Sequence, residues 1–146
     1  MIDNTDRPLL YNDNWSAKNL TTRNVTIVGG RYNHNCAHQR HSVSPEEFGW
    51  PSDLEMTEGI EENEKHFVSL FEFFGIENLI LRDIIFQDQR SYTLTLGNFK
   101  NALIENCAIE MITQVWPCNQ DGFHFWGPGQ FLTMRNIGGK TEDDFM

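Results

Sequence analysis

The sequence has few of the features that would tie the chain to a membrane, to nucleic acid or to a secretory leader. No apolar run approaches the roughly 18 residues that a membrane-spanning helix needs. Lys and Arg number 11 against 21 Asp and Glu, and this net charge of −10 argues against a basic surface for nucleic acid. Residues 1–7 lack the basic and apolar stretches of a signal peptide. These absences leave an acidic globular protein whose localisation the residues do not settle.

Cysteine is also scarce, and its pattern excludes a disulfide framework. The three cysteines are an odd number without a CxxC pair, so the redox compartment stays open. One of them belongs to an H-x-C-x-H-x-x-H run of residue types that can ligate zinc. No second cluster completes that run, so we expect solvated loop residues there, and neither a metal nor a cofactor. The cysteines are Cys36, Cys107 and Cys118, and the run consists of His34, Cys36, His38 and His41.

An internal repeat is the strongest signal that the sequence does contain. Leu79 and Ala102 occupy equivalent positions 23 residues apart, and Ala102 and Leu132 are 30 apart. We assign the whole excess to a loop insertion over 110–121. The aligned copies are 71–73 with 78–84, 94–96 with 101–107, 123–125 with 131–137, and an earlier copy at 24–30.

The apolar residues alternate within each copy, as they do in strands with one buried face. A period of about 23 residues that holds two or three short strands is typical of a solenoid whose coils bury their faces against each other. The L-x-x-L-x-L spacing of leucine-rich repeats is not present. We therefore predict an all-β parallel β-helix domain over 1–146, with coils around 10–30 and 66–146 and a long loop excursion over 31–65.

Asp83, Asn106 and Asn136 fall at one register just after a strand. Asn and Asp tolerate the left-handed conformation that a tight corner needs. Stacked side-chain amides can also hydrogen-bond along a solenoid. We predict a polar ladder at this corner, with three unrelated turn residues as the alternative.

Three carboxylates fall one coil apart. Asp121 lies 22 residues before Asp143 and 23 before Asp144, so a parallel solenoid brings all three to the same end of adjacent strands, about 4.8 Å apart. Mutual repulsion raises the pKa of one carboxyl and keeps it protonated as a general acid, while another activates water. This pattern suits glycoside hydrolysis. The alternatives are Asp side chains that cap turns, or a calcium site.

The motifs resemble the polygalacturonases of glycoside hydrolase family 28, within the right-handed, single-stranded, pectin lyase-like β-helices. The segment 119–122, N-Q-D-G, is similar to the family's N-T-D-G, and 143–144 to its D-D pair. The segment 90–106 looks like the coil "S-P-x-W-T-L-H … N-V-x-I-x-N", and 24–30 like N-V-T-I-x-G-G. Gln120, Glu142 and Phe145 depart from the family's Thr, Gly and Cys.

The resemblance implies inverting hydrolysis of an α-1,4 galacturonosyl linkage, without a cofactor. Asp121 corresponds to the general acid, and Asp143 with Asp144 to the pair that activates water. The implied partner is an acidic plant-type polysaccharide, with no nucleic acid or membrane, and the implied protein is secreted and monomeric. The residues expected to contact substrate are Asn119, His124, which alternates outward beside Asp121, Trp126 and Tyr92.

Two other functions stay open on the same fold. One is a non-catalytic β-helix that binds glycans, as adhesins and tail fibres do, and the other is a polysaccharide lyase. The family's G-H-G and R-x-K motifs would lie beyond Met146. We therefore expect the chain to be part of a longer enzyme and to be inactive alone.

Overall fold

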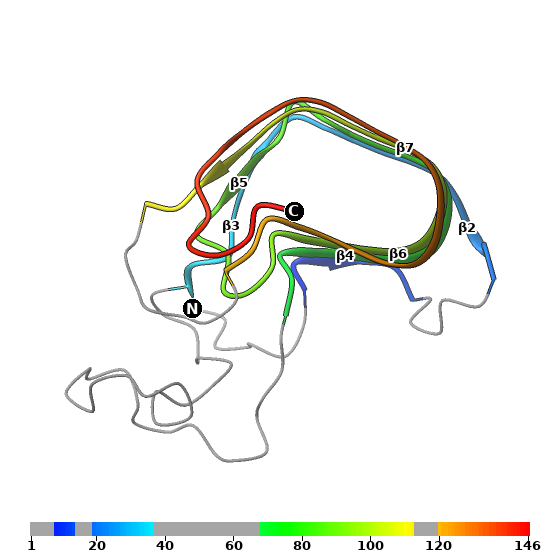
Figure 1. Ribbon diagram of the computed structural model, residues 1–146, viewed down its shortest axis with the longest axis horizontal. Helices are drawn as coiled ribbons and strands as arrows, with labels where there is room; N and C mark the ends of the chain where they lie inside the picture. Colours follow the sequence, from blue (N-terminus) through cyan, green and yellow to red (C-terminus); the bar gives the residue numbers. More distant parts are fainter. Residues whose placement is uncertain (1–7, 14–18, 37–67, 113–119) are drawn as a thin grey trace, which may run out of the picture.

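The structure is a computed structural model that describes residues 8–13, 19–36, 68–112 and 120–146. Within them, seven strands form one sheet in which every pairing is parallel, and the sheet curls strongly around an apolar core (Figure 1). No helix in this part of the chain could span a membrane. The strands are β1 Leu10–Tyr11, β2 Thr22–Val28, β3 Arg31–Asn33, β4 Phe71–Arg82, β5 Ile85–Gln87, β6 Leu94–Glu110 and β7 Phe123–Gly139.

Successive passes of the chain lie on top of one another in the view of Figure 1. We call β1 to β3 the first pass, β4 with β5 the second, β6 the third and β7 the fourth. Strand β3 pairs with β5, so the sheet continues through Arg31–Asn33. The prediction that a loop excursion begins at residue 31 is therefore wrong at its start, because Tyr32 turns inward and packs its ring 4.9 Å from that of Phe71. Residues 37–65 of that excursion lie outside the described part of the chain.

The pairing register confirms the repeat that the sequence predicts. Leu79 pairs with Ala102, and Ala102 with Leu132. The prediction that one insertion holds the whole excess is wrong by one residue. Leu94 pairs with Phe123 at an offset of 29 residues, and the offset reaches 30 only after a β-bulge between Gly97 and Phe99. Such a bulge adds one residue to one strand and increases its bend.

The second, third and fourth passes bend at the same three places, where residues adopt positive φ, and the first pass shares the second and third of these. Asn and Gly dominate these corners because they enter the left-handed region at the lowest cost. The bends let single long strands such as β6 wrap around the core. The first corner holds Gly75, Asn98 and Gly127, the second Asn24, Asn78, Asn101 and Phe131, and the third Gly29, Asp83, Asn106 and Asn136.

Two of these corners carry ladders of side-chain hydrogen bonds. At the third corner, Asn136 Nδ2 donates to Asn106 Oδ1 at 2.8 Å, and Asn106 Nδ2 donates to Asp83 Oδ1 at 2.9 Å. This confirms the predicted ladder. At the second corner, Asn101 donates to Asn78 and Asn78 to Asn24, each at 2.9 Å. This second ladder was not predicted, although Asn78 and Asn101 are 23 residues apart, as Asp83 and Asn106 are.

Inside the curled sheet, apolar side chains of successive passes stack on each other. Phe71, Phe86 and Phe123 are buried and meet edge to face, with ring centroids 5.1 and 6.1 Å apart. Phe145 continues the stack, with its centroid 6.0 Å from that of Phe123. Such edge-to-face pairs each add about 0.5–1.5 kcal/mol beyond area burial. Cys107 is buried in this core, as its position in the repeat predicts.

Replacing Asn106 by alanine tests the corner and the ladder together. Alanine forfeits both side-chain bonds and carries a Cβ at φ 52, where an L-residue pays about 1–2 kcal/mol. With about 1 kcal/mol per lost hydrogen bond, we expect Asn106→Ala to lower the free energy of unfolding by about 2–4 kcal/mol in urea titrations. The control Asn106→Gly keeps the conformation and should cost less. Equal losses in the two variants would contradict the left-handed constraint.

Candidate active site

The backbone of Asp121 is fixed just before β7 by hydrogen bonds to its carbonyl oxygen. Its carbonyl oxygen accepts hydrogen bonds from the Thr93 backbone N–H at 3.0 Å, from Thr93 Oγ1 at 3.2 Å and from Gln89 Nε2 at 3.4 Å. Residue Gly122 follows without a Cβ, and one built there would lie 2.3 Å from the Phe145 carbonyl oxygen. The third and fourth passes therefore fix the backbone from which the carboxyl projects.

Asp121 is 7% exposed, and its carboxyl has one described polar neighbour. Its Oδ2 lies 2.5 Å from His124 Nε2, while Oδ1 is buried and finds no partner among the described residues. Burial raises the pKa of this carboxyl above its ordinary value, and the charges of Asp143 and Asp144 raise it further. The hydrogen bond and charge of His124 act in the opposite direction, and the net pKa shift is upward.

Asp143 and Asp144 lie beside Asp121 on the following stretch of chain. Gly122 N–H donates to the Asp144 carbonyl at 2.8 Å, and Phe123 N–H donates to the Phe145 carbonyl at 3.0 Å. Both carboxylates are exposed, unlike Asp121. The predicted one-coil spacing therefore brings together one buried and two solvated carboxyl groups.

An aromatic ring system borders the Asp121 carboxyl. The Tyr92 and His124 rings are stacked, with centroids 3.9 Å apart and planes inclined by 16°. Partial burial raises the pKa of the Tyr92 hydroxyl, and the charges of Asp121 and Asp143 add to that rise. His124 follows the buried Phe123 in β7 and contacts the Asp121 carboxyl through Nε2. Tyr92 and His124 thus form one side of the acidic site.

Trp126 and Asn119 are the other two residues expected to contact substrate, and the structure describes the first of them. Trp126 lies two residues beyond His124 in β7, and it is 57% exposed. It therefore offers its ring to solvent on the outward side of the strand. Asn119 lies outside the described residues. The structure thus brings Asp121, Asp143, Tyr92 and His124 together and places Trp126 further along the same strand.

Glu72 is a candidate that the sequence analysis missed. Glu72, Thr95 and His124 are register partners on successive strands and so share one outward row. Burial raises the pKa of Glu72 to about 7. In the same region, the hydroxyl groups of Ser69 and Thr95 are 2.6 Å apart. The repeat places Glu72, Thr95 and His124 at equivalent positions, but three different residue types form no recognisable motif.

The residues that depart from the polygalacturonase motif all have structural roles. Gln120 is fully buried and its Nε2 donates to the Gln89 carbonyl at 2.5 Å, which pins the loop next to Asp121. Glu142 forms an ion pair with Lys140 at 2.5 Å. Phe145 is half-buried and packs against the core. Gln120 and Phe145 thus contact the backbone and core next to Asp121, and Glu142 pairs with a neighbouring lysine at the surface.

The expectation that the His/Cys run is a solvated loop is wrong for its first two members. His34 and Cys36 are 6% and 2% exposed, and His34 Nδ1 accepts a hydrogen bond from the Arg90 backbone N–H at 3.2 Å. Burial lowers the pKa of His34 to about 4, and the charge of Arg90 contributes. The sequence showed no apolar alternation there that would have marked these side chains as buried. His38 and His41 lie outside the described residues.

Comparisons with known proteins assign no family to the chain. No protein-family model, no curated protein and no solved structure matches it. In the described ranges, no group of three or more His, Cys, Asp or Glu side chains is arranged to hold a metal ion. The carboxyl groups of Asp121, Asp143 and Asp144 are therefore the main chemical feature of the described residues.

The raised pKa of Asp121 makes a testable contribution to stability. The protonated form is favoured in the folded state, so its stabilisation is complete below the ordinary pKa of Asp. It is lost as pH rises through the raised folded-state value. We expect the free energy of unfolding of the parent, relative to Asp121→Asn, to fall with rising pH across that window. Urea titrations at several pH values measure it, and a difference that stays constant with pH would contradict the shift.

His34 has the opposite pH dependence. Its pKa is lower in the folded protein than in the unfolded chain, so neutral His34 contributes fully above about pH 6.5. That contribution, at most about 3 kcal/mol from the size of the pKa shift, is lost as pH falls towards about 4. NMR titration of the His34 ring should show no protonation at pH 6, and His34→Gln should remove this part of the acid sensitivity. A His34 midpoint near 6.5 would contradict its burial.

Proposed function

We propose that this chain is part of a right-handed parallel β-helix that hydrolyses glycosidic bonds in an acidic, pectin-like polysaccharide. The reaction proposed is inverting hydrolysis with Asp121 as the general acid and Asp143 and Asp144 as the groups that activate water. The observation that carries this proposal is the pairing of a buried, raised-pKa carboxyl with two exposed carboxylates on the adjacent stretch of chain.

The β-helix proposal is supported by the way in which the passes repeat. The second, third and fourth passes pair in parallel with equivalent residues in register. Positive-φ corners recur at three equivalent places, and two of them carry side-chain ladders. Parallel strands joined by crossovers in one sheet are right-handed in nearly all proteins, which supports that hand.

The acid role follows from the electrostatics of Asp121. A general acid must still carry its proton when the substrate arrives, and burial together with two neighbouring negative charges favours the protonated form. His124 opposes this shift, but it also fixes the orientation of the carboxyl through Oδ2. Asp121 therefore combines a raised pKa with a defined direction.

The base role suits Asp143 and Asp144 because both are exposed. An exposed carboxyl group is accessible to water and can polarise a water molecule. The Asp144 backbone N–H donates a hydrogen bond to Asp143 Oδ1 at 3.0 Å, which holds the two residues of the pair together. Inversion requires room for that water between acid and base. The contrast in burial between Asp121 and the pair is consistent with this division of labour.

Aromatic side chains near the acid suit a saccharide substrate. The exposed ring of Trp126 and the stacked pair of Tyr92 and His124 offer apolar faces beside polar groups. Sugar rings combine apolar faces with hydroxyl edges, and amphipathic aromatic residues match both. The galacturonate identity of the sugar rests on the motif resemblance alone.

A non-catalytic glycan-binding β-helix is the second candidate, and one observation favours it. Asp121 is 7% exposed and its carboxyl contacts His124, an arrangement that also suits a carboxyl that fixes the strand entrance and delivers no proton. Such a protein binds oligosaccharide without turnover and is indifferent to the charge of Asp121. The activity of an Asp121 variant separates the two candidates.

The decisive variant is Asp121→Asn in the protein expressed from its complete reading frame. We expect release of reducing ends from polygalacturonate to fall by about a hundredfold to ten-thousandfold, the usual contribution of a general acid. The matched control is Asp83→Asn, the same change in a ladder on another face, where the amide oxygen can still accept from Asn106. Activity that survives Asp121→Asn, in a folded variant, would overturn the acid role.

A further inference from the structure

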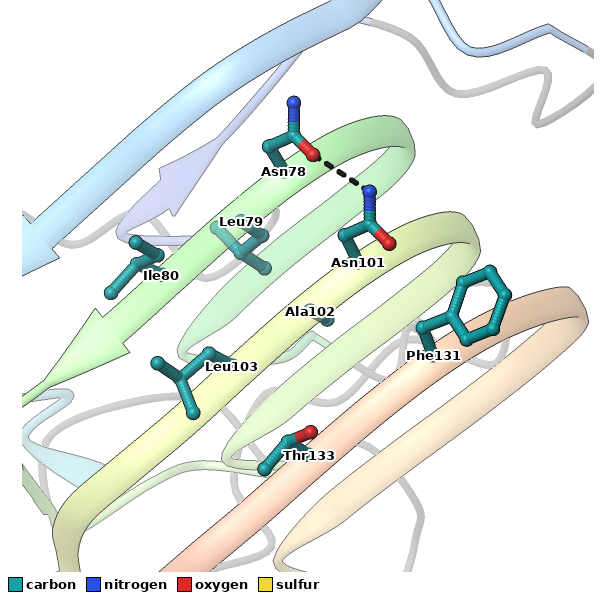
Figure 2. A pocket seen from close by; sticks show the side chains of 8 residues that line it. All are labelled: Asn78, Leu79, Ile80, Asn101, Ala102, Leu103, Phe131 and Thr133. Carbon is teal, nitrogen blue, oxygen red and sulfur yellow. Dashed lines mark hydrogen bonds between the residues drawn. The ribbon is translucent and has the colours of Figure 1, made fainter.

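A groove of about 380 Å³ crosses β4, β6 and β7 on another part of the sheet (Figure 2). Figure 2 shows the Asn78–Asn101 hydrogen bond at its edge. None of the residues that line this groove has a titratable side chain. Its lining can exchange no proton with a ligand, and the Asp121–His124 pair differs from it in this respect.

The Asp121 carboxyl presents its two oxygen atoms to different surroundings. Its Oδ1 is buried without a partner among the residues that the structure describes, and its Oδ2 lies 2.5 Å from His124 Nε2. The His124 side chain is 28% exposed, whereas the Asp121 side chain is 9% exposed. A proton that leaves this carboxyl therefore leaves through Oδ2, where the His124 ring lies.

The His124 ring is held with its edge free for hydrogen bonds. Tyr92 stacks on one face of the ring, with centroids 3.9 Å apart, and the ring edge carries both nitrogen atoms. Nε2 contacts Asp121, and Nδ1 forms no hydrogen bond to another described residue. In a neutral imidazole one nitrogen donates and the other accepts, so Nδ1–H is free to donate when Nε2 accepts from Asp121. The raised pKa of Asp121 supports this direction, because a protonated carboxyl donates to Nε2.

We propose that His124 is a second catalytic residue, which passes the proton of Asp121 to the leaving group of the substrate. The glycosidic oxygen takes the hydrogen of His124 Nδ1 as its bond to the anomeric carbon breaks. Nε2 takes the hydrogen of Asp121 Oδ2, so the ring stays neutral and changes tautomer while Asp121 becomes a carboxylate. Water bonds to the anomeric carbon and gives its proton to the Asp143–Asp144 pair, and exchange with solvent restores acid and base. This relay rests on the proposed hydrolysis and adds the group that touches the leaving oxygen.

The variant that tests the relay is His124→Gln in the protein expressed from its complete reading frame. A glutamine amide can still donate to Asp121 Oδ2 and hold its direction, but it passes no proton. We expect kcat on polygalacturonate to fall by about a hundredfold to ten-thousandfold with little change in KM. The matched control is His34→Gln, the same change in a buried histidine that contacts Arg90, and it should keep wild-type activity at neutral pH. A near-wild-type kcat in His124→Gln would overturn the relay.

The leaving group separates proton delivery from positioning. Nitrophenolate leaves without a proton, so His124→Gln and Asp121→Asn should each cleave a nitrophenyl oligogalacturonoside within about tenfold of the wild-type rate. The double variant should be no slower on polygalacturonate than the slower single variant, because both residues move the same proton. A loss in His124→Gln that is as large on the nitrophenyl substrate as on polygalacturonate would make His124 a positioning residue only and would refute the relay.

Nitrogen NMR of the His124 ring gives a readout that does not depend on activity. At the assay pH, the relay requires hydrogen on Nδ1 of the wild-type protein. Hydrogen on Nε2 alone would contradict it, because Asp121 would then accept and not donate.

Failure of the relay and failure of the proposed function are distinguishable. Loss of hydrolysis in Asp121→Asn with full hydrolysis in His124→Gln removes only the relay. A folded wild-type protein that releases no reducing ends removes both.

Discussion

The left-handed backbone at the three corners is the constraint on which the rest of this structure depends. Each corner turns the chain at the same point of the second, third and fourth passes, and this keeps Leu79, Ala102 and Leu132 in register. Register in turn stacks the aromatic core and sets the alternation that sends His124 outward and Phe123 inward. A one-residue slip would exchange these faces and would separate Asp121 from its neighbours.

The acidic site is a consequence of that stacking. Asp121 has a raised pKa because the strand entrance buries it and because parallel pairing places Asp143 and Asp144 beside it. The same pairing puts Glu72 in the row of His124. The electrostatics of the site therefore arise from residues that lie far apart in the sequence and adjacent in the curled sheet.

The sequence predicted the features that repeat and missed those that do not. The register, the Asp83 ladder and the proximity of Asp121 to Asp144 follow from a repeat of 23 residues with one longer interval, and both are visible without coordinates. The bulge opposite Gly97 adds a single residue, too small a change to separate from the adjacent insertion. The burial of His34 depends on packing from other passes, and no local pattern encodes it.

The stereochemistry of the product tests the central claim most directly. Proton NMR of polygalacturonate treated with the full-length protein records the anomer released before mutarotation. Inverting chemistry with Asp121 as acid and the Asp143–Asp144 pair as base predicts the β-anomer first from an α-linkage. An α-anomer released first, or an unsaturated product that absorbs in the ultraviolet, would contradict this account of the site.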